Sequence, residues 1–332
     1  MELSEYARMM NFFILIFLSA FSMAKSDHFD GKQFFNPGHR ETNSFLDLVK
    51  WKIGADTVKW PDYVKNRDYK APVLPEGKKA YFTFINHATF LIQTPDLTII
   101  TDPVFSERVS PVSFAGPKRV REPGVAFDRL PPVDVVIISH NHYDHMDIES
   151  LLNLEAKFHP LFIVPLKNRE FLMKKGLQNV IELDWWQEHK VKSTTFTLTP
   201  CLHWSSRSLF DQYETLWGSF LVSFEGFKFY FAGDTGYAEH FRDVKVRLGA
   251  PDVALLPIGA YEPRWFMKKH HMNPEEAVQA HKDLEAVHSF GMHFGTFQLT
   301  DEGINDPVTA LQKALGDVKN FTVLDQGEGR SF

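Results

Sequence analysis

The sequence predicts an α/β fold, an αββα sandwich in which two β-sheets pack face to face and helices cover their outer sides. The first observation is that short strand-like stretches alternate with helical stretches in both halves of the chain. The second is an apolar, β-branched run at residues 133–138, typical of a buried strand, which leads directly into a loop rich in histidine. Loops at strand ends tend to carry the functional site of α/β proteins.

Stretches rich in β-branched and aromatic residues mark the expected strands. They lie at residues 81–85, 89–93, 98–101, 133–138, 162–164, 180–183, 196–198, 219–224, 228–231 and 252–257. Helices are expected from residue 147, near residues 169–175 and at residues 274–284. The last is the best defined, because Asn273 can cap it, Pro274 suits its first position and two glutamates follow.

The histidine-rich loop reads H-x-H-x-D-H and places four potential metal ligands within six residues. His140 and His142 can point at one metal, while Asp144 and His145 can point at a second one about 3.5–4 Å away, as two-metal hydrolases require. The alternative is a polar loop in which the histidines occur by chance.

Composition narrows the function classes. The net charge of −6 argues against nucleic acid as a partner, since a basic footprint is expected of such proteins. The 44% hydrophobic content supports one large core or two modest ones, and 31 Phe suggest a well-buried interior or an apolar substrate groove. The single cysteine, Cys201, excludes an intrachain disulfide; it is either a soft metal ligand or a packing residue.

The N-terminus carries an apolar run from Met9 to Ala24, the length of a signal-peptide core and short for a membrane span of about 20 residues. Ser22 and Ala24 form a small-x-small cleavage pattern. We expect export to a periplasmic or envelope-associated location, with an uncleaved membrane anchor as the alternative. Residues 1–24 are thus a signal peptide or anchor, and residues 25–76 form a polar extension packed on the body through Trp51, Trp60 and Pro61.

The motif at residues 140–145 resembles the signature of the metallo-β-lactamase superfamily, whose members take two further histidines and a bridging aspartate from later loops. His203, Asp234 and His293 occur in that order, and Asp234 lies in a turn flanked by glycines. The resemblance implies an αββα sandwich of the metallo-β-lactamase type over residues 77–332, one domain because its ligands come from both halves. It also implies the following ligand sets: His140, His142 and His203 for one metal, Asp144, His145 and His293 for the other, and Asp234 between them.

Longer runs resemble the family of N-acyl-phosphatidylethanolamine-hydrolysing phospholipases D, from about residue 45 to the C-terminus. These runs are DPVFS at 102–106, GPKR at 116–119, ELDWW at 182–186, LWGS at 216–219 and PIGAYEPRWFM at 257–267. The last is the most specific. The resemblance implies a phosphodiesterase with two Zn²⁺, or other divalent transition metals, that activate a water for attack on phosphorus. It assigns catalytic roles to Asp144 and Asp234.

Substrate contacts are less well defined by the sequence. His271 matches a histidine near the substrate of that family, or is a surface histidine beside two lysines. Tyr143 contacts substrate or packs, and Arg207 can meet a phosphate through its planar fork. The chain departs from the family at Asn86, where relatives carry glycine; we interpret this as a change in a turn.

Two other function classes stay open. One is a lactonase or small phosphate-ester hydrolase of the same superfamily, which needs a closed polar pocket instead of the open apolar groove that a lipid needs. The other is a non-catalytic envelope-associated protein, against which the intact set of seven ligands argues. The expected partners are a phospholipid or other phosphodiester and a membrane surface. The oligomeric state stays open, with a homodimer among the options.

Overall fold

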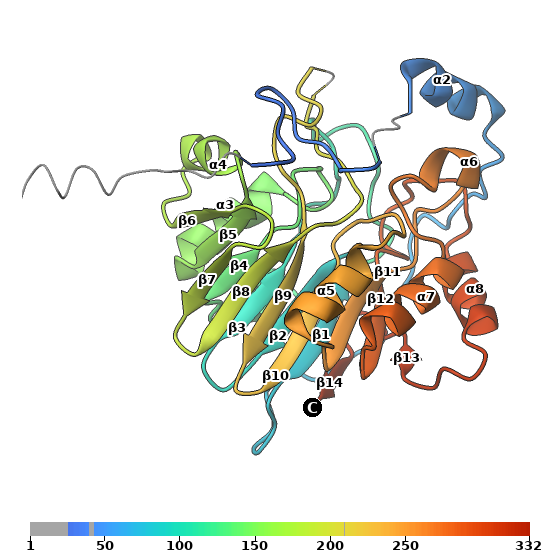
Figure 1. The fold of residues 1–332 in the computed structure, drawn as a ribbon. Helices are drawn as coiled ribbons and strands as arrows, with labels where there is room; N and C mark the ends of the chain where they lie inside the picture. Colours follow the sequence, from blue (N-terminus) through green and yellow to red (C-terminus); the bar gives the residue numbers. More distant parts are fainter. Residues whose placement is uncertain (1–25, 40–42, 209) are drawn as a thin grey trace, which may run out of the picture.

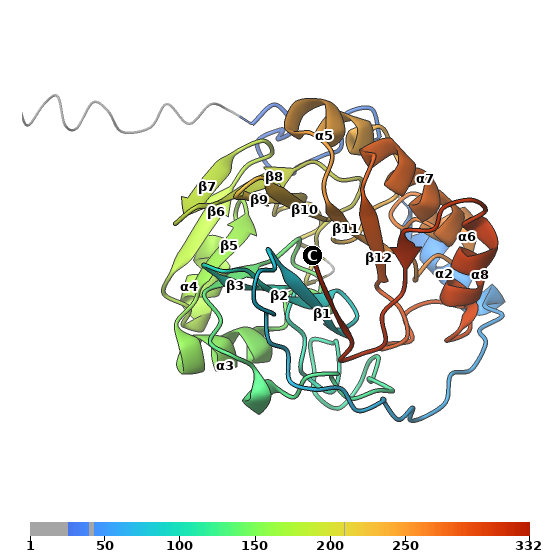
Figure 2. The same ribbon diagram turned by 90° about the horizontal axis from the view of Figure 1, so that it is seen from below.

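Two seven-stranded β-sheets pack face to face in the computed structural model, with helices on their outer sides (Figures 1 and 2). The structure describes residues 26–39, 43–208 and 210–332. The two packed sheets and their outer helices confirm the predicted αββα sandwich. The predicted signal peptide or anchor at residues 1–24 lies outside the described residues. Within the described part of the chain, no helix combines the length and the apolar character that crossing a membrane requires.

The first sheet has the strand order β14-β1-β2-β3-β4-β5-β6. Its strands are β1 (Tyr81–Asn86), β2 (Thr89–Gln93), β3 (Thr98–Thr101), β4 (Val135–Ile137), β5 (Leu161–Pro165), β6 (Val180–Leu183) and β14 (Gly329–Ser331). Strands β3 to β6 run parallel, and β1 and β2 pair antiparallel. The helices α3 (Ile148–Phe158) and α4 (Arg169–Lys175) cover this sheet, and the 3-10 helix η1 (Phe127–Arg129) precedes β4.

The second sheet has the order β13-β12-β11-β10-β9-β8-β7. Its strands are β7 (Glu188–Val191), β8 (Thr194–Thr199), β9 (Ser219–Phe224), β10 (Phe227–Phe231), β11 (Val253–Pro257), β12 (His288–Met292) and β13 (Phe321–Thr322). The helices α5 (His240–Leu248), α7 (Pro274–Leu284) and α8 (Asp306–Ala314) cover it (Figure 2). Two further helices, α2 (Phe45–Gly54) and α6 (Arg264–Met267), lie next to each other beside this half (Figure 1).

Phenylalanines fill the space between the sheets. Phe82 of β1 meets Phe229 of β10 edge to face, with ring centroids 5.6 Å apart, and neither ring is exposed. Such pairs contribute about 0.5–1.5 kcal/mol beyond the burial of their area. Packing between the sheets thus explains part of the abundance of Phe noted in the sequence.

Local signals located several elements well, and the predicted cap is one of them. Asn273 Oδ1 accepts a hydrogen bond from the Glu276 backbone N–H, and the Glu276 carboxylate accepts one from the Asn273 backbone N–H. The strands expected at 89–93, 98–101, 180–183 and 219–224 have the predicted bounds. The prediction missed β12, whose run His-Ser-Phe-Gly-Met lacks β-branched residues, and α5, a strongly polar helix that buries only one face.

The N-terminal extension packs on the body through two tryptophans. Trp51 Nε1 donates to Asp301 Oδ2 at 2.7 Å, and Trp60 Nε1 donates to the Glu302 carbonyl at 2.8 Å. Both indole rings are buried, whereas Pro61, also expected as an anchor, is exposed. Proline offers no side-chain donor, so the two indole N–H groups provide the attachment. The boundary at residues 76 and 77 stays a prediction.

Candidate metal centre

The histidines and aspartates named from the motif meet at loops that follow strands of both sheets. The loop after β4 carries His140 to His145, and the loop after β8 carries His203. Asp234 follows β10 and His293 follows β12. Strands β10, β11 and β12 run parallel, as do β3 and β4, so their carboxyl ends share an edge of each sheet. Stacking the two sheets brings these edges together.

A first cluster consists of His140, His142 and His203. His140 Nε2 lies 2.9 Å from His142 Nδ1, and His203 Nε2 lies 3.3 Å from that same nitrogen. All three donor nitrogens lie within 4.8 Å of one another. Imidazole nitrogens at such spacing suit a divalent transition metal such as zinc.

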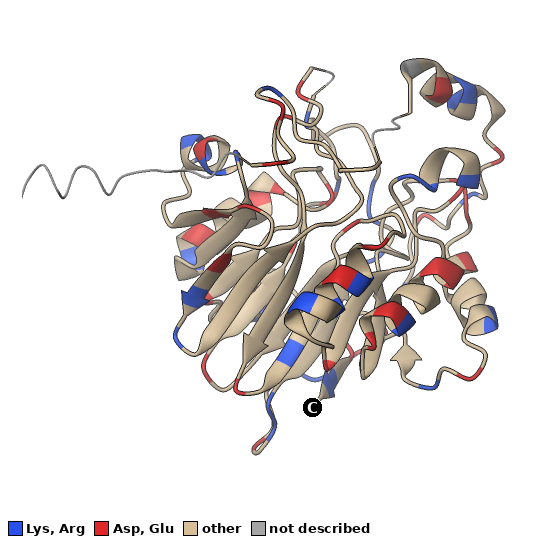
Figure 3. Ribbon diagram, viewed as in Figure 1, with Lys and Arg blue, Asp and Glu red and all other residues tan. Residues whose placement is uncertain are grey.

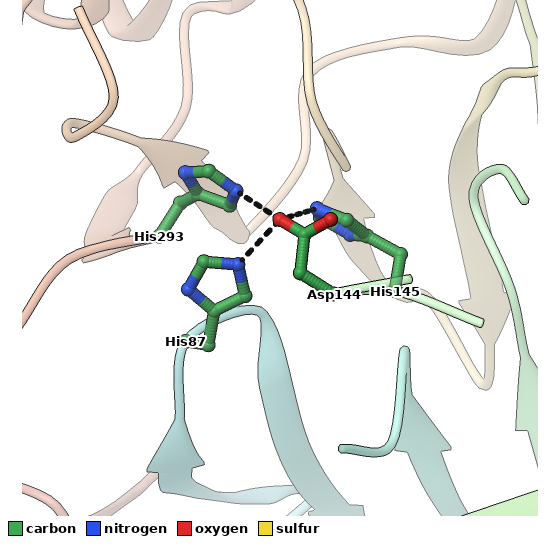
Figure 4. A group of neighbouring side chains, drawn as sticks. All are labelled: His87, Asp144, His145 and His293. Carbon is green, nitrogen blue, oxygen red and sulfur yellow. Dashed lines mark hydrogen bonds and ion pairs between the residues drawn. The ribbon is translucent and has the colours of Figure 1, made fainter. Parts of the chain in front are cut away.

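A second cluster surrounds Asp144 (Figure 4). Asp144 Oδ2 lies 3.4 Å from His145 Nε2 and 3.4 Å from His293 Nε2. Asp234 Oδ2 lies 3.2 Å from the same His145 nitrogen and 3.1 Å from the same His293 nitrogen. Two donors that each sit about 2.0–2.1 Å from a tetrahedral ion are roughly 3.3 Å apart. Each of the two imidazole nitrogens therefore lies near this spacing from both carboxylate oxygens.

Asp234 lies between the two clusters. Besides its contacts in the second cluster, Oδ2 lies 4.0 Å from His203 Nε2 of the first. The carboxylate is 2% exposed, and its Oδ1 has no hydrogen-bond partner, as is also true of His145 Nε2. Buried polar atoms without partners are rare in folded proteins. The unpartnered atoms and the donor chemistry both fit a metal at this place.

Neighbouring groups orient the imidazoles so that a free nitrogen faces the centre. His145 Nδ1–H donates to Asp102 Oδ2 at 2.6 Å, and His203 Nδ1–H donates to the His270 carbonyl at 2.9 Å. Ser139 Oγ donates to Asp102 at 2.5 Å and accepts from His140 Nδ1 at 2.9 Å. Such outer contacts fix the tautomer and raise the basicity of a metal-binding histidine.

The electrostatics of the centre favour ionised carboxylates among imidazoles. Burial opposes ionisation of Asp234, but the positive character of His145 and His293 prevails, and its pKa lies well below the usual range. Asp144 has a pKa lowered well below its usual range for the same reason. Burial lowers the pKa of His140 and of His203 well below the usual value. At His145 and His293 burial is outweighed by the carboxylates of Asp234 and Asp144, so the pKa of His145 lies well above its usual value and that of His293 rises to about 9. A metal requires neutral imidazoles, so its binding would displace a proton from each of these two histidines.

His271, expected on the substrate side, lies at the centre. Its Nδ1 is 3.7 Å from Asp234 Oδ2, and the side chain is 15% exposed. It forms a donor group with His203 and Asp234. His271 is therefore not an open surface histidine. Its contact with a substrate stays a prediction.

Arg207 and Tyr143 are joined to each other and to the ligand loop. Arg207 Nη1 donates to the carbonyls of Asn141 and Met146, at 2.8 and 2.9 Å, and the guanidinium lies 4.0 Å from the Tyr143 ring centroid. Tyr143 Oη donates to the Arg207 carbonyl at 2.7 Å. These contacts brace the loop that carries four of the ligand candidates. Contact of either side chain with a substrate stays a prediction.

The sequence left Cys201 as either a metal ligand or a packing residue, and in the structure it packs in the interior. Its thiol contacts the Asp234 carbonyl at 3.5 Å, and burial raises the pKa of the thiol. None of the four groups of metal-binding side chains found among the described residues includes it. The environment is that of a packing residue.

Two residues of the centre were not recognised in the sequence. Asp102 was noted only within the DPVFS run, and its role appears once β3 and β4 lie side by side. His87 directly follows Asn86, the position that departs from the family, and its Nε2 lies 3.0 Å from Asp144 Oδ2 (Figure 4). The available signal was a polar, potentially ligating side chain directly at the end of a buried strand.

The chain is similar to known proteins of one superfamily. A family model described as "Beta-lactamase superfamily domain" matches residues 98–294, more than half of the chain. The chain belongs to the metallo-β-lactamase superfamily. A solved metallo hydrolase of the archaeon Ignicoccus hospitalis has the same fold, with a TM-score of 0.59 and 23% identity over 76% of this chain and 98% of that one. The predicted superfamily and its sandwich are confirmed.

Curated relatives narrow the family. "N-acyl-phosphatidylethanolamine-hydrolyzing phospholipase D 1" of Caenorhabditis elegans is 38% identical over 75% of this chain and 74% of its own length. The mitochondrial protein of that name from Saccharomyces cerevisiae is 39% identical over 71% of this chain but 52% of its own length. This superfamily member therefore belongs to the family of these phospholipase D homologues, as predicted. It is a metal-dependent hydrolase by membership, with candidate metal-binding clusters of His and Asp.

Proposed function

We propose that the chain is a metal-dependent phosphodiesterase of the phospholipase D type, acting on N-acyl-phosphatidylethanolamine-like lipids at a two-metal centre. The observation that carries this proposal is the pair of donor clusters that meet at Asp234. Two-metal centres of this kind hydrolyse phosphoesters by in-line displacement. The phospholipase D relatives support the choice of substrate class.

Seven side chains would hold the metals, His140, His142 and His203 on one side, Asp144, His145 and His293 on the other, and Asp234 between them. Zn²⁺ suits this imidazole and carboxylate set, and other divalent transition metals share much of that preference. Bound metals would supply Lewis-acid charge for the phosphodiester oxygens and lower the pKa of an attacking water toward about 7. Asp234 would offset the repulsion between two close cations.

Beside these ligands, we assign His271 to the substrate side. Its imidazole lies next to Asp234, and burial lowers its pKa to about 4, so it is a neutral imidazole in the metal-free chain. A neutral imidazole there can orient the phosphodiester by donating one hydrogen bond. Water would break the bond between phosphorus and the ethanolamine oxygen, releasing an N-acylethanolamine and phosphatidic acid.

A hollow of about 640 Å³ adjoins the first cluster and can admit the substrate. Its lining includes Leu202, which precedes His203 in the sequence, and His270, whose carbonyl contacts the His203 side chain. The aromatic side chains of Phe35 and Tyr213 also line it. A second hollow of about 660 Å³ lies between α2, α6 and α8 and is lined by Trp51, among others. We assign substrate entry to the first hollow, because its lining includes His270, whose carbonyl accepts a hydrogen bond from the ligand candidate His203.

The surface of α2 and α6 supports contact with a membrane. Leu46 and Ile53 of α2 are 75% and 83% exposed, and Trp265 of α6 is 48% exposed. Lys50 lies 4.9 Å from the Trp265 ring, and α2 stands out from the body with basic residues on it (Figures 1 and 3). Exposed aliphatic and tryptophan side chains beside lysines suit the interface of an anionic bilayer.

The decisive experiment measures hydrolysis of N-acyl-phosphatidylethanolamine in mixed micelles by the purified chain, with metal content, beside a His142→Ala variant. We expect phosphatidic acid from the wild type only. A chain that holds two metals but leaves the lipid intact would reject the lipid assignment and favour a lactonase or small phosphate-ester hydrolase. A chain that binds metals without hydrolysing any such ester would favour the non-catalytic alternative.

We also propose export, resting on the apolar run from Met9 to Ala24 and its cleavage pattern. Mass spectrometry of the protein purified from its native cells tests this proposal. A mature chain beginning at Lys25 in the envelope fraction would support it. A full-length chain that stays in the membrane pellet would support the anchor instead.

A further inference from the structure

His87 lies in the turn between β1 and β2, outside every predicted ligand set, yet it reaches the second cluster. Its side chain is 1% exposed. Nε2 lies 3.0 Å from Asp144 Oδ2, and its ring centroid lies 4.0 Å from that of His293 (Figure 4). These residues and His145 form one group of donors. A buried imidazole so close to a candidate ligand needs a physical explanation.

The backbone of His87 is equally engaged. Its φ of +46° is unusual for a residue with a side chain. Its carbonyl accepts the His293 backbone N–H at 2.7 Å, and its own N–H donates to Thr296 Oγ1 at 3.1 Å. The turn of the first sheet is thereby attached to the loop that carries His293 in the second sheet.

We propose that His87 is a positioning residue for the second metal, a proposal that rests on the proposed two-metal function. Its Nε2–H would hold the Asp144 carboxylate, and its carbonyl would hold the backbone of His293. One residue would therefore fix two ligands that come from different sheets. Hydrogen bonds of this outer kind orient ligands and tune their affinity for metal.

The geometry separates this role from that of a ligand. His145 Nε2 and His293 Nε2 each lie 3.1–3.4 Å from a carboxylate oxygen of both Asp144 and Asp234. His87 pairs with Asp144 at 3.0 Å, the ordinary length of an N–H···O hydrogen bond. Its Nδ1 has no partner, which leaves Nε2 as the protonated donor.

The test compares the whole wild-type chain with His87→Leu and His87→Gln. Both variants have an unbranched Cβ and leave the backbone contacts of residue 87 in place, but only glutamine can donate to Asp144. Each chain is stripped of metal and titrated with Co²⁺ against a competing chelator, following the visible absorption of the first and second equivalents. Thermal unfolding of the metal-free chains is recorded in parallel.

We expect the second Co²⁺ to bind about 10–100-fold more weakly to His87→Leu, with the first equivalent changed less than threefold. His87→Gln should recover most of the lost affinity and the absorption of the second equivalent. Metal-free unfolding temperatures of the two variants should agree within a few degrees, because the backbone links remain.

Three results would overturn the proposal. One is a His87→Leu chain that loads both equivalents like the wild type. Another is a pair of variants that lose the second metal equally along with their unfolding temperature, which would mean a structural role. The third is an X-ray absorption spectrum in which both variants lose one nitrogen donor, which would make His87 a ligand. A wild-type chain that binds fewer than two metals would instead reject the two-metal function itself, and this proposal with it.

Discussion

His145 Nδ1 donates to Asp102 Oδ2 at 2.6 Å, and neither side chain is exposed to solvent. Asp102 directly follows β3, and the loop with His145 follows the parallel neighbour β4. The pair therefore connects the end of one strand to the ligand loop of the next. It also leaves Nε2 of His145, which has no other partner, directed at Asp144 and Asp234. Asp102 thus orients a ligand candidate without belonging to the predicted set.

Replacing Asp102 by asparagine should weaken metal binding without unfolding the chain. The amide keeps the shape of the carboxylate but removes the charge that favours a basic Nε2, and losses of about 10–100-fold in metal affinity are typical of such changes. Dialysis against a competing chelator, followed by elemental analysis, measures the affinity. Asp134→Asn is the matched control, because Asp134 contacts the Thr98 backbone on an exposed edge. Equal metal retention by both variants would contradict the assigned role.

Removing metal should lower the unfolding temperature of the wild type. Metal bound at the proposed two clusters would stabilise the folded chain by mass action, by about 2.7 kcal/mol when free metal is one hundred times the dissociation constant. The measurement is thermal unfolding with and without a chelator. His142→Ala, which lacks one candidate ligand of the first cluster, should show a smaller difference. A wild type indifferent to the chelator would argue against tight binding.

Acidic side chains introduced on the surface of α2 should impair hydrolysis of a lipid but not of a soluble ester. Leu46→Glu with Ile53→Glu places two charges where exposed apolar side chains would meet the bilayer. We expect about tenfold lower kcat/KM on anionic vesicles, which corresponds to about 1.4 kcal/mol. Hydrolysis of bis(4-nitrophenyl) phosphate should change less than twofold. Val246→Glu, at a 78% exposed position of α5, is the control. Equal losses in the double variant and the control would count against this surface.

Trp51→Phe should reduce the free energy of unfolding by about 1–3 kcal/mol. The change keeps most of the aromatic packing against Phe266, 5.0 Å away, but removes the hydrogen bond to Asp301. Thr57 still donates to that carboxylate, which limits the loss. Urea unfolding measures the difference. Trp265→Phe, at a half-exposed ring, should cost less. The reverse order would refute the idea that Trp51 attaches the N-terminal extension.

Stability should fall with acid partly because of His240. Burial lowers its pKa from 6.5 to about 3. Between these two pH values the unfolded chain binds a proton that the folded chain does not, so stability is complete above pH 6.5 and is lost as the pH falls toward 3. The slope from one such group is up to about 1.4 kcal/mol per pH unit. His240→Gln should make the acid side of the stability curve shallower, whereas substitution of the exposed His288 should not.

The features that could be predicted from the sequence are those that depend on contacts between residues close together in the chain. Asn273 caps α7 through contacts three residues away, and the H-x-H-x-D-H loop follows its strand directly, so neighbours in sequence were enough to recognise both. His87 and His293 are joined across the two sheets by a bond between residues far apart in the chain. No periodicity in the sequence encodes that pairing.

The amino-acid sequence was sufficient for the alternation of strands and helices, the ligand loop at residues 140–145 and, through resemblance, the family and its seven candidate ligands. The folded arrangement was needed to show Asp102 behind His145, His87 beside Asp144, and Arg207 turned to the backbone of the ligand loop. The physical reason is that periodicity, capping and motif spacing are local properties. Which buried polar atoms become partners depends on how the two sheets stack, and that stacking joins segments that the sequence keeps apart.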